Sequence, residues 1–501
     1  MDQLRDKVDS FVSKKLDSYQ KSNQTVKPST NNKIIHDTIL GTNIFYPHEM
    51  EIIDSPLIQR LRRINQMDVV SYVFPSANHN RFEHSLGVAI IADKIGNSLY
   101  REEKFSDYEY KRFLYHVRLA GILHDVGHCA FSHMSEEVYA SIQEIADLKK
   151  DQKFADASPH EILSYLIITS NVFLEFFTNF ILKRHTNLQK YDIDLDLIGK
   201  MVIGYTIDDP DKAFWIETIN GFFDADKLDY IQRDSYYSGI QMNLDLDRFF
   251  HTIDLIKIEG KTRLAVKFNG VNILEQIVFN KLMLTNRVYN HHKVRAAECL
   301  FKSLLTLIMN KPGISGIDIS CATDFLNYTD DAFLSLANTC QDAEIKQLAN
   351  NLVERILPKR ALVITGRSIN NSTDLIEVTK LNKNPEDIEY LKNAIVKECQ
   401  KEESSITDLD VWIDVPGQVL FKEGMLTPIK ISHDNDIEYE IFANIFPITD
   451  WVKAFNEYKW QAHVFTYPKF VGVVSKVSKE IFEKVYDLQF NEINDKICKI
   501  E

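Results

Sequence analysis

Two short clusters of histidine and carboxylate residues carry the chemistry that this sequence offers. The segment 80–87 (NRFEHSLG) contains His84, and the segment 120–128 (AGILHDVGH) contains the adjacent pair His124 and Asp125. Because adjacent side chains leave a helix about 100° apart, both members of the pair can reach one ion at the helix surface. His84, from a different helix, can complete one side of a metal site. Apolar residues before His124 predict that the donors emerge from a buried helix, where exclusion of water strengthens electrostatic interactions.

This donor set needs one more carboxylate, from another helix, to surround a divalent ion. The segment 223–230 (FDADKLDY) offers Asp224, Asp226 and Asp229. Imidazole and carboxylate donors suit Mg, Mn, Fe or Zn, and the set does not choose among them. A lone His-Asp pair is common in proteins, and the three aspartates also fit a solvated helix face. The occurrence of both clusters in one chain favours the metal site.

The bulk composition limits the class of protein. The 501-residue chain is 45% hydrophobic and 26% charged, which is ordinary globular composition with enough apolar residues for a large core. Its formal net charge of −14 provides no overall basic field that would attract nucleic acid. A phosphate substrate would therefore need a metal ion or clustered Lys and Arg side chains.

The cysteines and the hydropathy favour a cytoplasmic protein. None of the six cysteines belongs to a CxxC pair, which argues against a zinc finger or a disulfide framework and fits a reducing compartment. The N-terminal residues do not resemble a signal peptide. The sequence contains no run of about 18 apolar residues, which a membrane span would need. We therefore expect no membrane partner.

Hydrophobic periodicity divides the chain into three regions, 1–32, 33–310 and 311–501. The first is an amphipathic helix followed by a polar linker, the second is mostly helical, and the third is helical and then, beyond residue 361, α+β. Helices are expected at 84–100, 108–126, 158–169, 221–233 and 272–309. Strands are expected as a hairpin at 255–258 and 263–268, and at 361–365, 411–415 and 470–474. A terminal helix is expected at 479–490, and an acidic turn at 433–436.

These motifs resemble a known family, the HD-domain deoxynucleoside triphosphate triphosphohydrolases, especially the SAM-and-HD-domain type of animals and its bacterial relatives. The resemblance covers residues 33–293 and continues more weakly to 359. The stretches that carry it are IDSP (53–56), QRLRRI (59–64), FP (74–75), HNRFEHSLG (79–87), 120–133, DADKLDY (224–230) and RD (233–234). The resemblance implies a mainly α-helical HD-domain core, placed at 33–310, with a smaller α+β C-terminal lobe. Only about thirty residues precede the match, too few for an independent domain, so we expect the family's SAM domain to be absent.

The resemblance selects the metal ligands and the reaction. It implies that a divalent metal is held by His84, His124, Asp125 and Asp226, which decides among the three aspartates. The family hydrolyses a dNTP to a deoxynucleoside and inorganic triphosphate by attack at the α-phosphorus. Such chemistry needs an activated water, neutralisation of the triphosphate charge and a proton for the leaving 5′-oxygen.

The family positions also imply acid–base residues. His128 and Glu136 correspond to a His–carboxylate pair beside the α-phosphate, with Glu136 in the place of the family's shorter Asp. His133 corresponds to a residue near the 5′-oxygen, and His160 to another active-site histidine. Outside this context, His160 would be read as an ordinary residue at a helix start.

Seven further residues correspond to substrate contacts. Phosphate contacts are implied for Arg81, Lys227 and Lys281, the last standing where the family has an Arg, which keeps the charge but loses bidentate geometry. Contacts to the sugar and its 3′-hydroxyl are implied for Gln66, Tyr230 and Asp234. Tyr289 corresponds to an aromatic residue that stacks under the sugar and disfavours a 2′-hydroxyl.

A regulatory site is also implied. In the animal enzyme a guanine nucleotide activator is read at positions that correspond here to Lys33, Asp54, Gln59, Arg62, Arg355 and Lys359. A second nucleotide position, for GTP or a dNTP, corresponds to Asp245 and Arg248. Such sites lie between subunits in the family, so the resemblance implies a homo-oligomer, with a tetramer favoured. Each residue alone also fits a structural role, as Asp54 fits a helix cap.

Two alternatives stay open at this point. The chain can be another HD-domain phosphohydrolase or a nuclease, against which Tyr230, Asp234 and Tyr289 argue. It can also be a nucleotide-binding or single-strand nucleic-acid-binding protein with a vestigial centre, against which the intact ligands and His128 argue.

Overall fold

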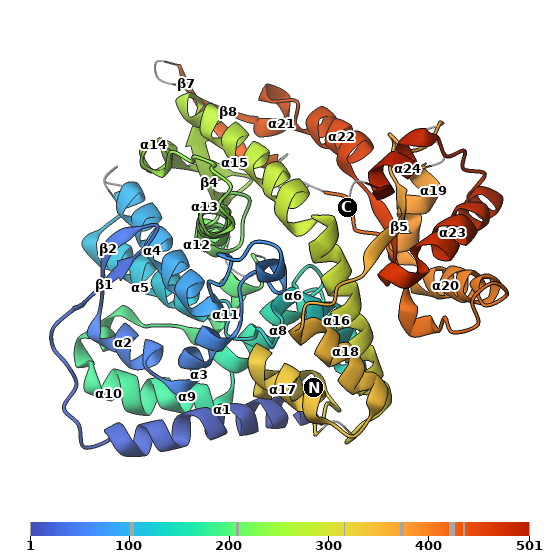
Figure 1. Cartoon of the computed structure of the whole chain (residues 1–501). Coiled ribbons are helices and arrows are strands. Elements are labelled where there is room, and N and C mark those ends of the chain that lie inside the picture. Colours follow the sequence, from blue (N-terminus) through green and yellow to red (C-terminus); the bar gives the residue numbers. More distant parts are fainter. Residues whose placement is uncertain are drawn as a thin grey trace. The chain divides into compact units, whose positions relative to one another are not determined.

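In the computed structural model, the described residues are 2–100, 105–206, 210–314, 316–370, 375–419, 426–433 and 436–499. The chain forms two compact units (Figure 1). The first comprises Met1–Asn280, Gly316–Leu336 and Glu423–Phe446, and the second comprises Lys281–Ser315, Ala337–Lys422 and Pro447–Glu501. Each unit thus draws on several separate stretches of sequence. The boundaries expected at 32/33 and 310/311 stay predictions.

Two long helices form the centre of the first unit. These are α4 (Arg81–Tyr100) and α5 (Asp107–Leu123), which pack along each other and are buried over most of their length. α5 begins with a capping box, in which Ser106 and Glu109 satisfy each other's backbone N–H groups. Burial on nearly all sides explains why their sequences carry apolar residues on every face.

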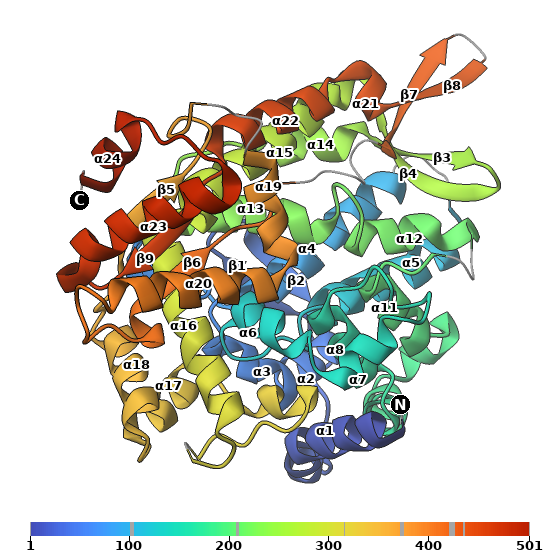
Figure 2. The same cartoon turned by 90° about the vertical axis from the view of Figure 1, so that its right-hand side faces the viewer.

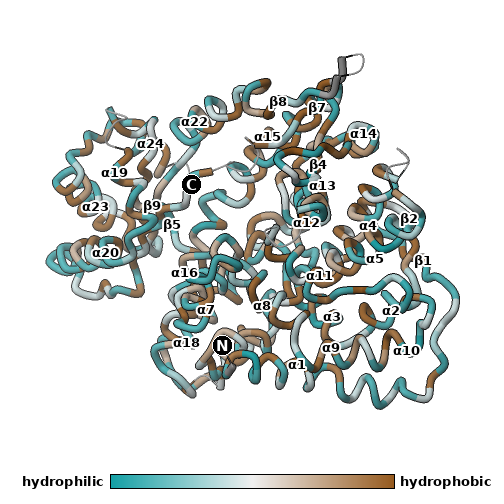
Figure 3. Tube along the Cα trace, turned by 180° about the vertical axis from the view of Figure 1, so that it is seen from behind, coloured by the Kyte–Doolittle hydropathy of each residue, from teal (hydrophilic) through white to brown (hydrophobic). Residues whose placement is uncertain are grey.

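The first unit contains further helices (Figure 1). They are α1 (Asp2–Asn23), α2 (Pro47–Ile53), α3 (Pro56–Gln59), α6 (Ser132–Tyr139), α7 (Gln143–Leu148), α8 (Pro159–Ile168), α9 (Asn171–Glu175), α10 (Leu182–Arg184), α11 (Leu195–Val202), α12 (Ala213–Ile219), α13 (Ala225–Ser238), α14 (Leu246–Thr252) and α21 (Phe442–Ile445). α15 (Val271–Leu284) and α17 (Asp330–Thr339) begin in this unit. The expected N-terminal amphipathic helix is α1, whose apolar face is buried; hydrophobic and hydrophilic residues alternate along it in Figure 3.

The first unit also contains two small sheets. β1 (Lys33–Asp37) and β2 (Gly41–Phe45) form an antiparallel hairpin in which Lys33 pairs with Phe45. β3 (Ile253–Ile258), β4 (Lys261–Lys267), β7 (Pro428–His433) and β8 (Asp436–Ile441) form a second sheet in that order. Its central pair, β4 and β7, is parallel, and the two outer pairs are antiparallel hairpins (Figure 2). The expected hairpin at 255–268 is β3–β4. The acidic turn expected at 433–436 includes residues 434 and 435, which lie outside the described residues.

The second unit packs helices against a three-stranded antiparallel sheet. The strand order is β5 (Lys359–Ile364), β9 (Ala462–Thr466) and β6 (Val411–Asp414). Its helices are α16 (His292–Asn310), α18 (Ala343–Val353), α19 (Leu375–Lys380), α20 (Pro385–Cys399), α22 (Ile448–Lys459), α23 (Val471–Tyr486) and α24 (Glu492–Lys499). α20 and α23 lie side by side, and α23 covers β5 (Figure 2).

The fold class is confirmed: a mainly helical core carries small sheets and an α+β C-terminal part. Two local expectations are wrong. The helix expected over 272–309 is interrupted by a π-helical turn at Thr285–Tyr289 between α15 and α16. The strand expected at 470–474 is the start of α23, and the strand of this region is the preceding β9. A short apolar run does not distinguish a buried strand from a buried helix segment.

Within the described ranges, no single helix is long and apolar enough to cross a membrane; the bent pair Pro159–Ile168 and Asn171–Arg184 meets the length and composition criteria only jointly. The six cysteines, all within those ranges, are free thiols.

Candidate metal centre and active site

Three segments of the first unit bring the four expected metal ligands together. His84 lies on α4, His124 and Asp125 follow α5, and Asp226 lies in the first turn of α13. His84 Nε2 lies 3.3 Å from His124 Nε2 and 2.9 Å from Asp226 Oδ1, and Asp125 Oδ1 lies 3.2 Å from His124 Nε2. His84, His124 and Asp125 are buried, whereas the side chain of Asp226 is 35% exposed. The cluster is therefore open to solvent beside Asp226.

A turn, and not a helix face, orients the central pair. His124 is the C-cap residue of α5, and Asp125 belongs to the turn that follows. Arg60 holds this turn by donating hydrogen bonds to the carbonyl oxygens of Val126 and His128. The helix expected over 108–126 thus ends sooner than the periodicity predicts, and His124 and His128 do not share a helix face.

Hydrogen bonds at the outer ring nitrogens fix the orientation of both imidazoles. His84 Nδ1 lies 2.7 Å from Asp229 Oδ2, and Asp229 in turn accepts two hydrogen bonds of 2.8 Å from Arg233. His124 Nδ1 lies 2.8 Å from the carbonyl oxygen of Gly121. Each ring therefore carries its proton on Nδ1 when neutral, and its Nε2 lone pair points into the cluster. Such outer partners hold metal-ligating histidines in place in known sites.

The electrostatics of the cluster also suit a cation. Burial lowers the pKa of His84, but its hydrogen bonds to Asp226 and Asp229 outweigh burial and raise the pKa to about 10. Burial raises the pKa of Asp226, but the hydrogen bond and charge of His84 lower it overall. The cluster thus gathers positive charge beside its carboxylates. Two neutral imidazoles and two carboxylates balance a divalent ion, so the residues present fit the implied metal.

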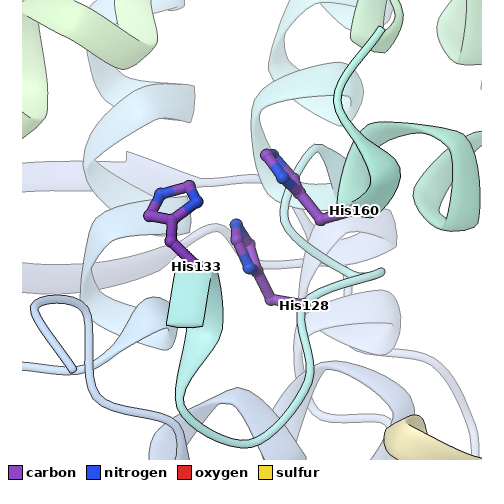
Figure 4. Close-up of side chains that lie close together, drawn as sticks. All are labelled: His128, His133 and His160. Carbon is purple, nitrogen blue, oxygen red and sulfur yellow. The ribbon is translucent and has the colours of Figure 1, made fainter. Parts of the chain in front are cut away.

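A second group of three histidines lies beside this cluster (Figure 4). His128, His133 and His160 each place a ring nitrogen within 4.8 Å of the others. The rings of His128 and His160 are stacked, with centroids 3.9 Å apart and an interplanar angle of 17°. Lone pairs lie in the ring plane, so stacked rings direct them side by side and not at a single point. His84 and His124 meet at 77°, which makes their pair the better metal site.

Glu136 pairs with a different histidine from the one expected. Its Oε1 accepts from His160 Nδ1 at 2.9 Å, and its Oε2 lies 2.8 Å from His133 Nδ1. The expected partner, His128, instead has its Nε2 atom 3.3 Å from Asp125 Oδ1. The expected His128–Glu136 pair is therefore wrong in this structure. One carboxylate therefore spans His133 and His160.

The pKa values in this second group differ strongly between His160, Glu136 and His128. Burial lowers the pKa of His160, but the charge of Glu136 raises it overall to about 9. Burial raises the pKa of Glu136, and His160 with the His133 hydrogen bond holds it well below its usual range. Burial and the nearby Arg81 hold the pKa of His128 well below its usual value. Near neutral pH His160 is thus a cation paired with an anionic Glu136, and His128 is neutral.

Two of the three cations expected at the phosphates, Arg81 and Lys227, lie at the edges of the metal cluster. Arg81 is buried and donates to Asp125 Oδ2 at 2.9 Å, to Ser132 Oγ at 3.0 Å and to the Gln66 carbonyl at 3.3 Å. Lys227 Nζ donates to Asp224 Oδ2 and to the Gly221 carbonyl, each at 2.7 Å. A guanidinium has five N–H donors and an ammonium three, so each cation keeps donors beyond these contacts.

Three expected sugar-contacting residues belong to this unit. The Gln66 carbonyl accepts from Arg81, which pairs with Asp125. Tyr230 and Asp234 lie on α13, which also carries Asp226. Asp234 is buried and accepts from His79 Nε2 at 2.8 Å, in the segment that precedes α4. Gln66 is buried, and its side-chain oxygen has no hydrogen-bond partner among the described residues. A small cavity of about 50 Å³ lies against the cluster, lined by His124, His160, Glu161, Asn220, Asp226 and Lys227 among others.

Part of the expected regulatory site is assembled on the surface of the first unit. Arg62 Nε donates to Gln59 Oε1 at 2.8 Å, and the charges of Lys33 and Arg62 act on the Asp54 carboxyl, whose pKa burial raises. Asp245 instead caps α14 by accepting from the Arg248 N–H at 3.0 Å. Four other expected residues belong to the second unit. Lys281 and Tyr289 are expected at the substrate, and Arg355 and Lys359 at the activator. These roles stay predictions.

Two residues behind the expected ligands, Asp229 and Arg233, support the site although the sequence did not predict this role. Asp229 was one of three candidate ligands, but it binds the outer nitrogen of His84 and leaves the ligand position to Asp226. Arg233 pairs with Asp229 one helical turn away. The i,i+4 spacing of an acidic and a basic residue on one helix was the available signal.

Comparison with known protein families identifies the class. Residues 81–197 match the HD domain, and residues 244–489 match the HD associated region. The first match includes His84, His124 and Asp125. The chain therefore contains an HD domain followed by an HD-associated region.

Individual relatives indicate which HD-domain proteins this chain is similar to. The chain is homologous to deoxynucleoside triphosphate triphosphohydrolase SAMHD1: it is 30% identical to the Danio rerio protein over 276 residues and 29% identical to the Homo sapiens protein over 275 residues. Each match covers 52% of this chain and 42% of the relative, so the chain spans less than half the length of these relatives. An uncharacterized protein of Methanocaldococcus jannaschii is 26% identical over 473 residues, which are 93% of this chain and 83% of that protein.

Proposed function

We propose that this chain is a metal-dependent dNTP triphosphohydrolase, which converts a dNTP and water to a deoxynucleoside and inorganic triphosphate. The observation that carries the proposal is the convergence of His84, His124, Asp125 and Asp226 beside Arg81 and Lys227. The homology to SAMHD1 supports the choice of substrate.

The four residues would hold a divalent ion of the Mg, Mn, Fe or Zn class, which would supply Lewis acidity to a phosphoryl oxygen. Arg81 and Lys227 use their remaining donors to neutralise triphosphate oxygens. Arg81 also fixes Asp125 through its 2.9 Å ion pair, so the substrate cation and the ligand carboxylate are held together. Lys281, from the second unit, is proposed as a third phosphate contact.

The histidine–glutamate group supplies the proton. In the proposed step the oxygen of water bonds to the α-phosphorus and water releases a proton to solvent, while the bond to the 5′-oxygen breaks and that oxygen takes a proton from the group. His133 is the best donor, because its side chain is 59% exposed while its Nδ1 stays bound to Glu136. His160 and Glu136 maintain the charge pair behind it, and neutral His128 lies between this pair and Asp125.

Recognition of the deoxyribose is assigned to polar groups on α13 and to one tyrosine. Tyr230, Asp234 and Gln66 are proposed to contact the sugar and its 3′-hydroxyl. Tyr289 is proposed to stack under the sugar and reject a 2′-hydroxyl by its bulk.

We also propose that GTP or a dNTP activates the protein by binding at Lys33, Asp54, Gln59 and Arg62. The activator sites are proposed to lie in a homo-oligomer, with a tetramer favoured. The residues proposed to complete them are Asp245, Arg248, Arg355 and Lys359.

Product-resolved turnover tests the reaction. With Mn or Mg, each dNTP should give deoxynucleoside and triphosphate, and release of pyrophosphate or dNMP would contradict the assignment. Asp226→Asn, which removes one ligand, should lower turnover by at least about 10³-fold, whereas Asp247→Asn, at an exposed site on α14, should not change it. The same assay with paired dNTPs and added GTP, alongside sedimentation, tests activation and assembly. Asp54→Ala should abolish any stimulation and leave the unstimulated rate unchanged.

A further inference from the structure

A buried carboxylate far along the chain joins two segments of the proposed active site. Asp330, the first residue of α17, is 5% exposed. Its Oδ2 accepts from the backbone N–H of Asn65 at 2.9 Å, and its Oδ1 accepts from the backbone N–H of Phe131 at 2.8 Å. Both oxygens are thus used to hold backbone, one in the segment before Gln66 and one at the start of α6. All of these residues belong to the first unit.

The start of α6 needs such an anchor because its backbone is unfavourable. Phe131 and Ser132 have φ values of +57° and +37°, in the left-handed region that residues other than glycine rarely adopt. Such conformations persist only when surrounding contacts over-determine them. α17 supplies two of these contacts, the Asp330 carboxyl group on the Phe131 N–H and the Phe333 ring against the Phe131 ring, with centroids 6.1 Å apart.

The anchored turn is connected to both sides of the proposed chemistry. Ser132 Oγ donates to the Asn65 carbonyl at 2.9 Å and accepts from Arg81 Nε at 3.0 Å, and Arg81 in turn pairs with Asp125. The next residue on α6 is His133, the proposed proton donor. A shift of the turn would therefore move His133 relative to Asp125.

We propose that Asp330 is a positioning residue, which holds the strained turn so that His133 and Glu136 stay aligned with the metal ligands. The inference rests on the proposed function for its effect on turnover. It does not rest on that function for its effect on the backbone. A residue needed only for stability would lower the amount of folded protein without separating kcat from KM.

Asp330→Asn tests the proposal, because the amide keeps one acceptor and sets an N–H₂ group against the other backbone N–H. We expect kcat to fall at least about 10-fold, since small misplacements of catalytic groups have effects of this size, with KM and bound metal changed less than about two-fold. Hydrogen exchange should become faster in segments 128–139 and 63–67. Asp331→Asn, at the exposed neighbouring residue, should change none of these quantities.

The outcomes separate this proposal from the proposed function. Unchanged hydrogen exchange at 128–139 in Asp330→Asn, or a fall in kcat that only matches a loss of folded protein or metal, would overturn the positioning role. If the wild-type protein does not hydrolyse any dNTP, the proposed function fails, but the exchange comparison still decides whether Asp330 holds the turn. If Asp330→Asn does not fold, Asp330→Ser, which retains one short acceptor, is measured in the same way.

Discussion

At the scale of single residues, ring orientation separates the two histidine groups. His84 and His124 meet edge to face, with their outer nitrogens bound to Asp229 and to a carbonyl, so both lone pairs converge. His128 and His160 are stacked, and Glu136 holds one of them as a cation. The proposed function therefore assigns metal binding to one group and proton transfer to the other. Ring orientation, and not the partner at Nδ1, separates the groups, because His84 and His160 each bind a carboxylate at Nδ1.

Asp229→Asn tests the support behind the metal ligands. The amide can still contact His84 Nδ1 but loses the charge that Arg233 and His84 share, so His84 is oriented less firmly. We expect the affinity of the metal-free protein for Mn²⁺ to fall about 10- to 100-fold, measured by calorimetric titration. An affinity equal to that of wild type would show that Asp229 serves packing alone. Asp247→Asn serves as the exposed control.

At the scale of elements, the sequence predicted most of the helices that carry the site. α4 and α8 have the expected spans within a few residues, because their apolar periodicity reflects real burial. The end of α5 and the break within the helix expected over 272–309 were missed, because a turn held by Arg60 and a π-helical turn depend on contacts that periodicity does not encode.

Some features of the site were also predictable from short motifs, whereas others depend on contacts between distant residues. The four ligands were predictable from motif resemblance, and the structure brings them together. The pairing of Glu136 with His133 and His160 was not, because sequence spacing does not determine which ring the carboxylate reaches. Asp330 could not be found from spacing, since about two hundred residues of chain separate it from the turn that it holds.

Close packing of α4 on α5 gives a test at this scale. A Cβ atom added at Gly121 would lie 2.8 Å from backbone atoms of Ala89 on α4, which cannot move without separating the helices. Gly121→Ala should therefore destabilise the protein by about 1–3 kcal/mol and displace His124, whose Nδ1 bonds to the Gly121 carbonyl. Urea unfolding and metal content measure the two effects.

The control for this substitution lies on the same helix pair. At Gly96 an added methyl group would lie 3.1 Å from the tip of Leu114, which can rotate away, and in ordinary contact with the Phe113 ring at 3.5 Å. Gly96→Ala should be close to neutral, because the better helix propensity of Ala offsets a small adjustment. Equal destabilisation by both substitutions would contradict the view that Gly121 is required for the approach of the two backbones.

At the scale of the whole molecule, the first unit is assembled from segments that are distant in sequence. The candidate metal centre uses residues 84, 124, 125 and 226, and Asp330 reaches the adjoining turn from Gly316–Leu336, a separate stretch of the same unit. The HD-associated match begins at residue 244 and includes this stretch. The part of the chain that follows the HD domain therefore contributes to the frame of the proposed active site.

This assembly predicts how stability depends on pH. Burial raises the pKa of Asp330 from its ordinary value of 3.8 to about 7, although the N–H groups of Asn65 and Phe131 lower it. In the folded protein Asp330 therefore keeps its proton where the unfolded chain has lost it. The resulting stabilisation is fully present below about pH 4, falls as the pH rises, and is lost above about pH 7. A shift of this size corresponds to a change on the order of 4 kcal/mol.

Urea unfolding of wild type and Asp330→Asn at pH 5 and pH 8 measures this effect. The other titrating groups are shared by both proteins, so their contributions cancel in the difference. The free energy of unfolding of wild type minus that of Asp330→Asn should be smaller at pH 8 than at pH 5, because only wild type loses the proton. Asp331→Asn should follow wild type at both pH values. A difference that does not change with pH would mean that Asp330 titrates near its ordinary pKa, and that its carboxylate holds the two backbone N–H groups in the ionised form throughout.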